Sequence, residues 1–223
     1  MKINGNFVTL SDSVSGLTQV AGSEVEFAVE GERVHVIAAP LLNSPQATAA
    51  DLQGRLEQAG YSQFAVRFSA AGVVIVDGRA FEEKLDQWVI NEGGRAAEAA
   101  ERIRNCFYRG ETSLELGFLG LKTLPPVLDK LENLQELSLS YNQLTAFAVP
   151  SELVNLQRLD LYNNQLTAFS VPSELVNLQT LSLSHNQLTA FSVPRELVNL
   201  QQLSLSYNQL TAFAVPSELV NLQ

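Results

Sequence analysis

The sequence predicts an α/β solenoid, with a parallel sheet on its concave face and short helical turns on its convex face, preceded by a small α+β domain. Three observations lead to this fold class. A unit that begins LSLSYNQLTAF at Leu137 returns at Leu159, Leu181 and Leu203, each time 22 residues later. The same apolar positions recur in every copy, which indicates stacked repeats that bury a shared core. Residues 1–92 contain no such repeat but alternate polar and apolar residues, which predicts the separate domain.

Each repeat begins with a predicted strand and turn. Leu137 alternates with Ser138 and Leu139 with Ser140, so leucines point to one face of the strand and hydroxyls to the other. Asn142 follows where the chain must turn, and its side-chain amide suits backbone groups that a turn leaves unpaired. We expect its equivalents to stack into a ladder under the strands. They are Asn164, Asn186 and Asn208.

The second half of each repeat supplies another apolar column and the convex side. One phenylalanine per copy predicts a second buried column, formed by Phe147, Phe169, Phe191 and Phe213. Pro150 and the two residues after it predict a short helical turn, because proline suits the first helical position and an acidic residue suits its positive end. We interpret the resulting carboxylates as turn caps and not as a cation site. They are Glu152, Glu174, Glu196 and Glu218.

An amphipathic helix is predicted over residues 95–109, from the sequence RAAEAAERIRNCFYRG. It leads into an irregular first repeat at Leu114, which precedes Leu137 by 23 residues and has Leu119 in place of the asparagine. Terminal repeats are expected to be atypical, because they close the core against solvent. We therefore expect a helical N-terminal cap followed by repeats over residues 110–223.

The α+β domain is predicted from hydrophobic patterns alone. The stretches EVEFAV (24–29) and RVHVIA (33–38) predict a hairpin that turns at Gly31, and QFAVRF and VVIVDG predict two more strands. Helices are expected in DLQGRLEQAG, after the capping residue Thr48, and in AFEEKLDQWVI. This order of elements indicates one small domain over residues 1–92. No family resemblance is identified for it.

The repeat pattern L-x-x-L-x-L-x-x-N-x-L resembles the leucine-rich repeat family. Its residues are Leu134, Leu137, Leu139, Asn142 and Leu144. The preceding helix with TSLELGFLGLKTLPP is similar to the entry caps of bacterial leucine-rich repeat proteins, including effectors and those that precede Roco-type GTPase modules. The chain lacks the cysteine clusters of extracellular members and so resembles the intracellular or bacterial kind. The resemblance covers residues 95–223 and implies a non-catalytic protein-binding module.

Composition restricts partners and location. The net charge of −10 argues against nucleic acid and anionic membrane surfaces as partners. Cys106 is the only cysteine, so no internal disulfide can form and a reducing, cytoplasmic compartment is expected. No apolar run is long enough to span a membrane, and the N-terminus does not resemble a signal peptide. The Ser, Thr and Asn content of MKINGNFVTLSDSVSG leaves an alternative, secretion into a host cell without a cleaved signal.

No arrangement of residues indicates catalysis. His35 and His185 lack the spacing of metal ligands, and the segment with Gly117 and Gly120 lacks the lysine and hydroxyl of a phosphate-binding loop. We interpret Cys106 as a small buried side chain of the cap helix and not as a nucleophile. We therefore expect no enzymatic activity, no cofactor and no metal.

Differences among the repeat copies fall mainly on or beside the strand and point to a binding face. Selection for binding explains this, and relaxed constraint at solvent-exposed positions explains it as well. We predict a protein-binding concave face, because aromatic and charged side chains are typical of interfaces. Its residues are Glu136, Ser138, Ser140, Tyr141, Arg158, Asp160, Tyr162, Asn163, Thr180, Ser182, His185, Gln202, Ser204 and Tyr207. Arg158, Asp160, Tyr162 and Asn163 form the predicted centre.

Two functions remain open from the sequence. The first is a non-catalytic interaction module with a protein partner. The alternative is the recognition half of a larger bacterial signalling or effector protein, whose catalytic domain, of GTPase or ubiquitin ligase type, lies beyond Gln223. Leu210, Phe213 and Val215 belong to the last copy, where we expect an open end that continues into further chain or self-associates.

Overall fold

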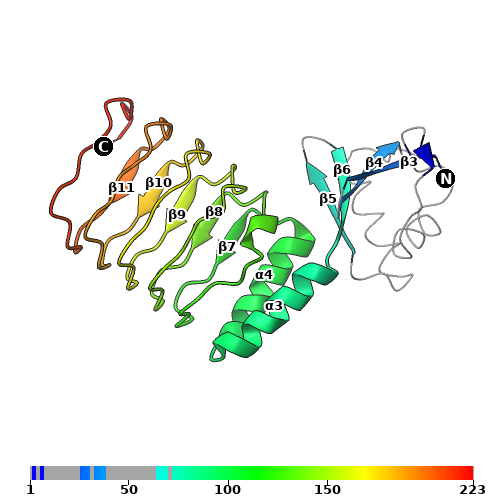
Figure 1. Ribbon diagram of the computed structural model, residues 1–223, viewed down its shortest axis with the longest axis horizontal. Helices are drawn as coiled ribbons and strands as arrows, with labels where there is room; N and C mark the ends of the chain where they lie inside the picture. Colours follow the sequence, from blue (N-terminus) through cyan, green and yellow to red (C-terminus); the bar gives the residue numbers. More distant parts are fainter. Residues whose placement is uncertain are drawn as a thin grey trace. The chain divides into compact units, whose positions relative to one another are not determined.

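The chain forms two compact units in the computed structural model (Figure 1). The first comprises Met1–Glu82 with Tyr108–Gly110, and the second comprises Glu83–Phe107 with Glu111–Gln223. The structure describes residues 2–3, 6–7, 26–30, 33–38, 64–69 and 72–222, with side chains from Gly78 onward except Arg79.

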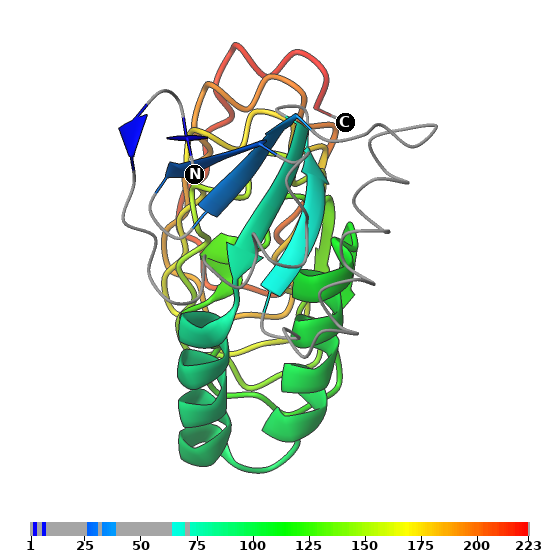
Figure 2. The same cartoon turned by 90° about the vertical axis from the view of Figure 1, so that its right-hand side faces the viewer.

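The described part of the first unit contains a four-stranded antiparallel sheet in the order β3-β4-β6-β5 (Figure 2). Its strands are β3 (Glu26–Glu30), β4 (Arg33–Ala38), β5 (Phe64–Ser69) and β6 (Gly72–Asp77), and a two-stranded sheet pairs β1 (Lys2–Ile3) with β2 (Asn6–Phe7). Ile75 is the register partner of both Val34 and Val66, so apolar residues align across three strands. The predicted hairpin and the two later strands are present. The helix predicted after Thr48 lies outside the described residues.

The second unit is a solenoid around a five-stranded parallel sheet. Its strands are β7 (Ser113–Glu115), β8 (Glu136–Ser138), β9 (Arg158–Asp160), β10 (Thr180–Ser182) and β11 (Gln202–Ser204). Leu114, Leu137, Leu159, Leu181 and Leu203 are successive register partners, so each repeat adds one strand in constant register (Figure 1). The predicted solenoid with its parallel sheet is confirmed.

The asparagine ladder forms as predicted. The side-chain Nδ2 of Asn164 donates to the carbonyls of Leu139, at 2.9 Å, and Leu161, at 3.2 Å, and its Oδ1 accepts from the N–H of Leu144 at 3.1 Å. Asn186 makes the equivalent bonds in the next repeat. One side chain therefore satisfies backbone groups of two adjacent repeats, which ties them together in the buried interior.

The phenylalanine column is buried only in its middle. Phe169 and Phe191 are each 8% exposed, whereas Phe147 is half-buried and Phe213 is 36% exposed. The predicted burial is therefore wrong for Phe147, whereas the exposure of Phe213 fits the open end expected for the last copy. Phe213 belongs to the last repeat, whose outer side no other repeat covers, and the residue that precedes Phe147 in the column is Leu124 instead of a ring.

The convex side consists mostly of tight turns. Leu153 N–H donates to the Pro150 carbonyl at 3.3 Å, and Leu156 N–H donates to the Leu153 carbonyl at 3.0 Å. These bonds span three residues and are not continued, so the predicted helical turns are single 3₁₀-type turns. The irregular first repeat instead carries a short 3₁₀ helix, η1 (Leu128–Lys130).

Helix α4 (Ala96–Arg109) caps the first strand and lies within one residue of the predicted range. A terminal strand leaves backbone groups unpaired at its edge. Arg102 Nη1 donates to the Glu115 carbonyl at 2.7 Å, and Arg95 Nη1 donates to the Phe118 carbonyl at 2.8 Å. Glu98 pairs with both arginines, and its hydrogen bond with Arg95 is the main cause of its lowered pKa.

Helix α3 (Arg79–Glu92) lies beside α4 at the β7 end of the sheet (Figures 1 and 2). Trp88 Nε1 donates to Thr123 Oγ1 at 3.0 Å, and the Glu92 carboxylate accepts from the N–H of Lys122 at 2.6 Å. Most of this helix therefore belongs to the repeat unit, and the division falls after Glu82, whereas we expected it near residue 92. The hydrogen bonds of Trp88 and Glu92 join the helix to the repeat unit, and Leu85, which lies in the sequence between the boundary of the two units and Trp88, is fully buried.

Candidate functional site

The parallel register brings the predicted face together in rows. Glu136, Arg158, Thr180 and Gln202 are successive partners, and so are Ser138, Asp160, Ser182 and Ser204. The exposed members of the predicted set are Glu136, Tyr141, Arg158, Asn163, Gln202, Ser204 and Tyr207. The half-buried members are Ser138, Asp160, Tyr162, Thr180, Ser182 and His185.

Ser140 is the one predicted residue that is buried, at 8% exposure. Its expected place on the open face is therefore corrected. The first repeat approaches closely here, because a Cβ on Gly117 would stand only 3.2 Å from both the Ser140 carbonyl oxygen and Oγ. The equivalent Ser184 is also buried, at 7% exposure, although the repeat before it has Tyr162 at this position. Gly117 therefore permits the close approach of the first repeat, but it is not what buries this serine position.

A residue in left-handed backbone conformation follows each strand of this sheet. The φ angles are 59° at Phe118, 54° at Tyr141 and Asn163, 57° at His185 and 56° at Tyr207. The N–H of Tyr141 donates to the Tyr162 carbonyl at 2.9 Å, and the following repeats repeat this bond, so the turn continues the ladder between repeats. Asparagine tolerates positive φ well, whereas an aromatic residue adopts it at a conformational cost.

Five rings form a continuous column beside these turns, which we call the ring ladder. It consists of Phe118, Tyr141, Tyr162, His185 and Tyr207. Centroid distances between successive rings are 4.2, 5.2, 5.0 and 4.1 Å, and the first and last pairs are stacked. The third ring comes from a different position in its repeat, because Asn163 occupies the left-handed position and the ring belongs to the residue before it.

Hydrogen bonds with neighbouring residues fix the position of Tyr162 in the ring ladder. Its N–H donates to Asp160 Oδ1 at 2.9 Å, which fixes the backbone where the ring departs from the strand. Its side-chain hydrogen bond with Tyr141 is the main cause of the raised pKa of its phenol, and desolvation and the Asp160 carboxylate act in the same direction. The predicted centre lies within one repeat: Arg158 and Asp160 are the two ends of strand β9, and Tyr162 and Asn163 belong to the turn after it.

The first, irregular repeat contributes residues that the sequence reasoning missed. Phe118 is 63% exposed and stacks on Tyr141, and Ser113 Oγ lies 3.5 Å from Glu136 Oε2. The signal for Phe118 is present in the sequence, because aligning LELGFLGL with LSLSYNQL places it opposite Tyr141. Leu119, which takes the asparagine position, is buried instead.

The described residues hold no metal-binding cluster. In this part of the chain there is no group of three or more His, Cys, Asp or Glu side chains that could hold a metal ion. Cys106 is 3% exposed, and its thiol donates to the Glu111 carbonyl at 3.3 Å. The geometry of the face suits recognition, because stacked rings present their edges and hydroxyls next to charged side chains.

The comparisons with known proteins agree with this geometry. The model described as leucine-rich repeats (2 copies) matches residues 132–175, 154–196 and 176–223. The repeats belong to the leucine-rich repeat family. Comparison with curated proteins finds no match. Domains built from leucine-rich repeats are typical protein-interaction modules with an extended concave surface.

Two solved bacterial structures share the leucine-rich repeat fold. One is the functional domain of InlJ from Listeria monocytogenes, at 24% identity and a TM-score of 0.53, with 62% of this chain and 31% of that chain covered. The other is YopM, a leucine-rich effector protein from Yersinia pestis, at 23% identity and a TM-score of 0.51, with 64% and 45% covered. The chain thus spans less than half the length of either. In the described residues no helix is long and apolar enough to cross a membrane.

Proposed function

We propose that the leucine-rich repeats bind a protein partner through the ring ladder and the charged residues Glu136 and Arg158 of the same face, without catalysis. The observation that carries this proposal is the unbroken ladder across the repeat that contains Asn163. If the rings only reflected the residue at the left-handed position, asparagine there would interrupt them. Tyr162 fills the gap from the neighbouring position, so the surface is continuous although the sequence changes.

The chemistry of the ladder favours a protein over a carbohydrate. Sugars stack on open ring faces. Here a stacked neighbour covers one face of Phe118, Tyr141, His185 and Tyr207, and Tyr162 is half-buried. Phe118 and Tyr207, the two end rings, are the most exposed. The ladder instead offers ring edges and phenol hydroxyls. Glu136 and Arg158 are register partners and carry opposite charges, which together with tyrosine is typical of protein interfaces.

The proposal is tested by affinity capture with wild type and with the triple variant Tyr141→Ala, Tyr162→Ala, Arg158→Glu. A matched control carries Val154→Ala and Val176→Ala, two exposed apolar residues outside the predicted face. We expect a partner that wild type and the control retain and that the triple variant loses, with circular dichroism unchanged. A partner retained equally by all three proteins would refute the ring ladder as the binding site.

A narrower proposal concerns the role of this binding surface in a larger protein. The leucine-rich repeats would serve as the recognition part of a larger bacterial signalling or effector protein that acts in the cytoplasm or in a host cell. The fold shared with the Yersinia pestis effector supports it at the level of architecture. Capture from bacterial and from host lysates in parallel separates the two settings, because a ladder-dependent partner in only one lysate assigns the location.

A further inference from the structure

A pocket of about 420 Å³ lies between the irregular first repeat and the repeat after it. Its walls come from residues 122–129 and 145–150, and their apolar groups include Leu124, Pro125 and Phe147. This volume falls within the range of small-ligand sites and exceeds what a single aromatic side chain needs. We call it the inter-repeat pocket. It is separate from the ring ladder and does not depend on the function proposed above.

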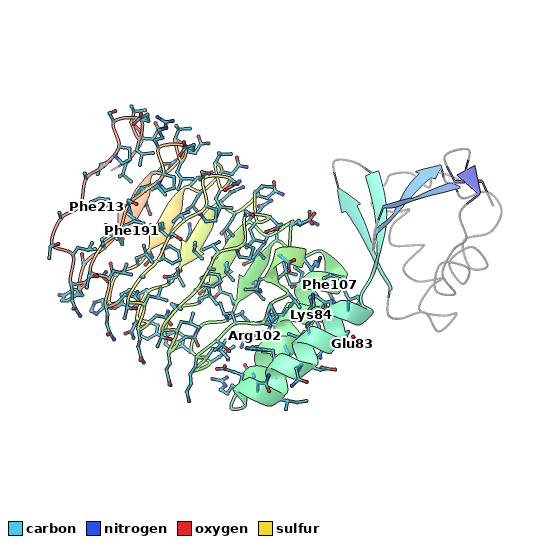
Figure 3. The ribbon with its side chains drawn as sticks, in the orientation of Figure 1. Glu83, Lys84, Arg102, Phe107, Phe191 and Phe213 are labelled. Atoms are coloured by element: carbon cyan, nitrogen blue, oxygen red, sulfur yellow. The ribbon has the colours of Figure 1, made fainter. Side chains whose placement is uncertain are left out.

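The pocket lies where the phenylalanine column lacks a ring. Phe169, Phe191 and Phe213 stack with centroid distances of 6.2 and 6.1 Å, and two of these rings are labelled side by side in Figure 3. Every later repeat supplies a phenylalanine at this position, whereas the first repeat supplies Leu124, which lies 23 residues before Phe147. Phe147 is accordingly more exposed than the two rings that follow it.

The wall opposite Phe147 is held in place and does not collapse onto it. Pro125 and Pro126 fix the backbone dihedral φ directly after Leu124. The preceding Thr123 accepts a hydrogen bond from Trp88 Nε1 at 3.0 Å and donates one to Glu92 Oε2 at 2.5 Å. Because helix α3 holds this segment from outside, the missing ring leaves a space instead of a repacked core.

One polar atom of the pocket residues lacks a partner. Asp129 Oδ1 is buried and accepts no hydrogen bond from the protein, while Oδ2 of the same carboxylate lies 3.6 Å from Lys130 Nζ. A buried acceptor without a donor is costly. Asp129 lines the pocket and its side chain as a whole is 38% exposed, so a rotation of the carboxylate would bring this oxygen within reach of an N–H of an occupant. The pocket thus combines a vacant aromatic position with an unmet acceptor.

We propose that the inter-repeat pocket binds the indole side chain of a tryptophan in an extended peptide of a partner protein. The indole ring continues the aromatic column next to Phe147, and its N–H donates to Asp129. A second pocket of about 350 Å³ lies on the other side of Pro126, lined by Trp88 and polar residues of α3. It receives an adjoining apolar residue of the same peptide.

The test uses N-acetyl-L-tryptophanamide as the probe and ¹H–¹⁵N spectra of the full chain as the readout. We expect saturable shifts at the amides of residues 122–129 and 145–150, and none with N-acetyl-L-leucinamide. Leu124→Phe supplies the missing ring and should abolish these shifts without lowering the melting temperature. Tyr207→Ala, a ring-ladder variant, should leave them unchanged.

The role of Asp129 is tested by comparing the probe with its 1-methylindole analogue, which lacks the N–H. Wild type should bind the analogue about tenfold more weakly, and Asp129→Ala should bind the two equally. Thr145→Phe, at an exposed position on the pocket wall, replaces Leu124→Phe if that variant does not fold. Shifts that map elsewhere, an absence of saturable binding, or binding that survives in the folded pocket-filling variant would each overturn the proposal.

Discussion

Replacing Asn164 by alanine should destabilise the repeats more than any exposed asparagine replacement. Its side chain is 7% exposed and makes three short hydrogen bonds to backbone groups of two repeats. At a net contribution of about 1 kcal/mol per bond, its loss costs roughly 3 kcal/mol. That is a large part of the 5–15 kcal/mol by which domains are typically stable.

The matched control is Asn177→Ala. This asparagine is exposed, and its Nδ2 donates to the Val154 carbonyl at 2.9 Å. Water replaces that bond after mutation, so the expected cost is below about 1 kcal/mol. Asn208 tests the role of burial, because it makes the same three bonds as Asn164 but is only half-buried; about half the cost is expected.

The assay is urea unfolding followed by far-UV circular dichroism, with Trp88 fluorescence as a second probe at the cap end. Repeat arrays lose cooperativity easily, so the free energies are comparable only where both probes coincide and the m-value is unchanged. Equal losses for Asn164→Ala and Asn177→Ala would show that the buried ladder does not hold the repeats together.

Three further outcomes follow from the structure. Glu98→Gln should lower the melting temperature at pH 7 but not in strong acid. The pKa of Glu98 is lowered in the folded protein, mainly by the hydrogen bond with Arg95. The contribution of this carboxylate to stability is therefore complete above the unfolded pKa near 4.5 and is lost as the pH falls through the folded pKa. Leu183→Ala, at a fully buried position, should cost roughly 2–5 kcal/mol in urea unfolding, and Leu205→Ala, half-buried in the last repeat, should cost clearly less. Asn163→Val should cost about 1–2 kcal/mol, because φ is 54° there, whereas Asn163→Gly should be nearly neutral in the same assay.

The repeats were predictable because their stability depends on local pattern and nearest neighbours. Leu137 and Asn142 occupy equivalent positions in every copy, so a fixed period determines strand, turn and stacking together. The cap helix was predicted to within one residue because its apolar face has a clear helical period.

Features that depend on contacts between unlike segments were not predictable. One such contact is the close approach of Gly117, in the irregular repeat, to the carbonyl and hydroxyl oxygens of Ser140. The place of α3 with the repeats depends on the bond between Trp88 and Thr123, which lie 35 residues apart. To predict that the ring ladder is continuous, one would need to know that Asn163 has a positive φ and that the ring of Tyr162 lies next to that of Tyr141.

The repeat with Tyr162 and Asn163 separates two tasks that the other repeats combine in one residue. In those repeats one aromatic residue both adopts the left-handed turn and supplies the ring. A substitution at that position therefore changes the turn and the aromatic surface together. Here asparagine adopts the turn and tyrosine supplies the ring from the end of the strand. A solenoid with this arrangement in every repeat would keep its aromatic surface while the turn position became free to change, so that one property could evolve without loss of the other.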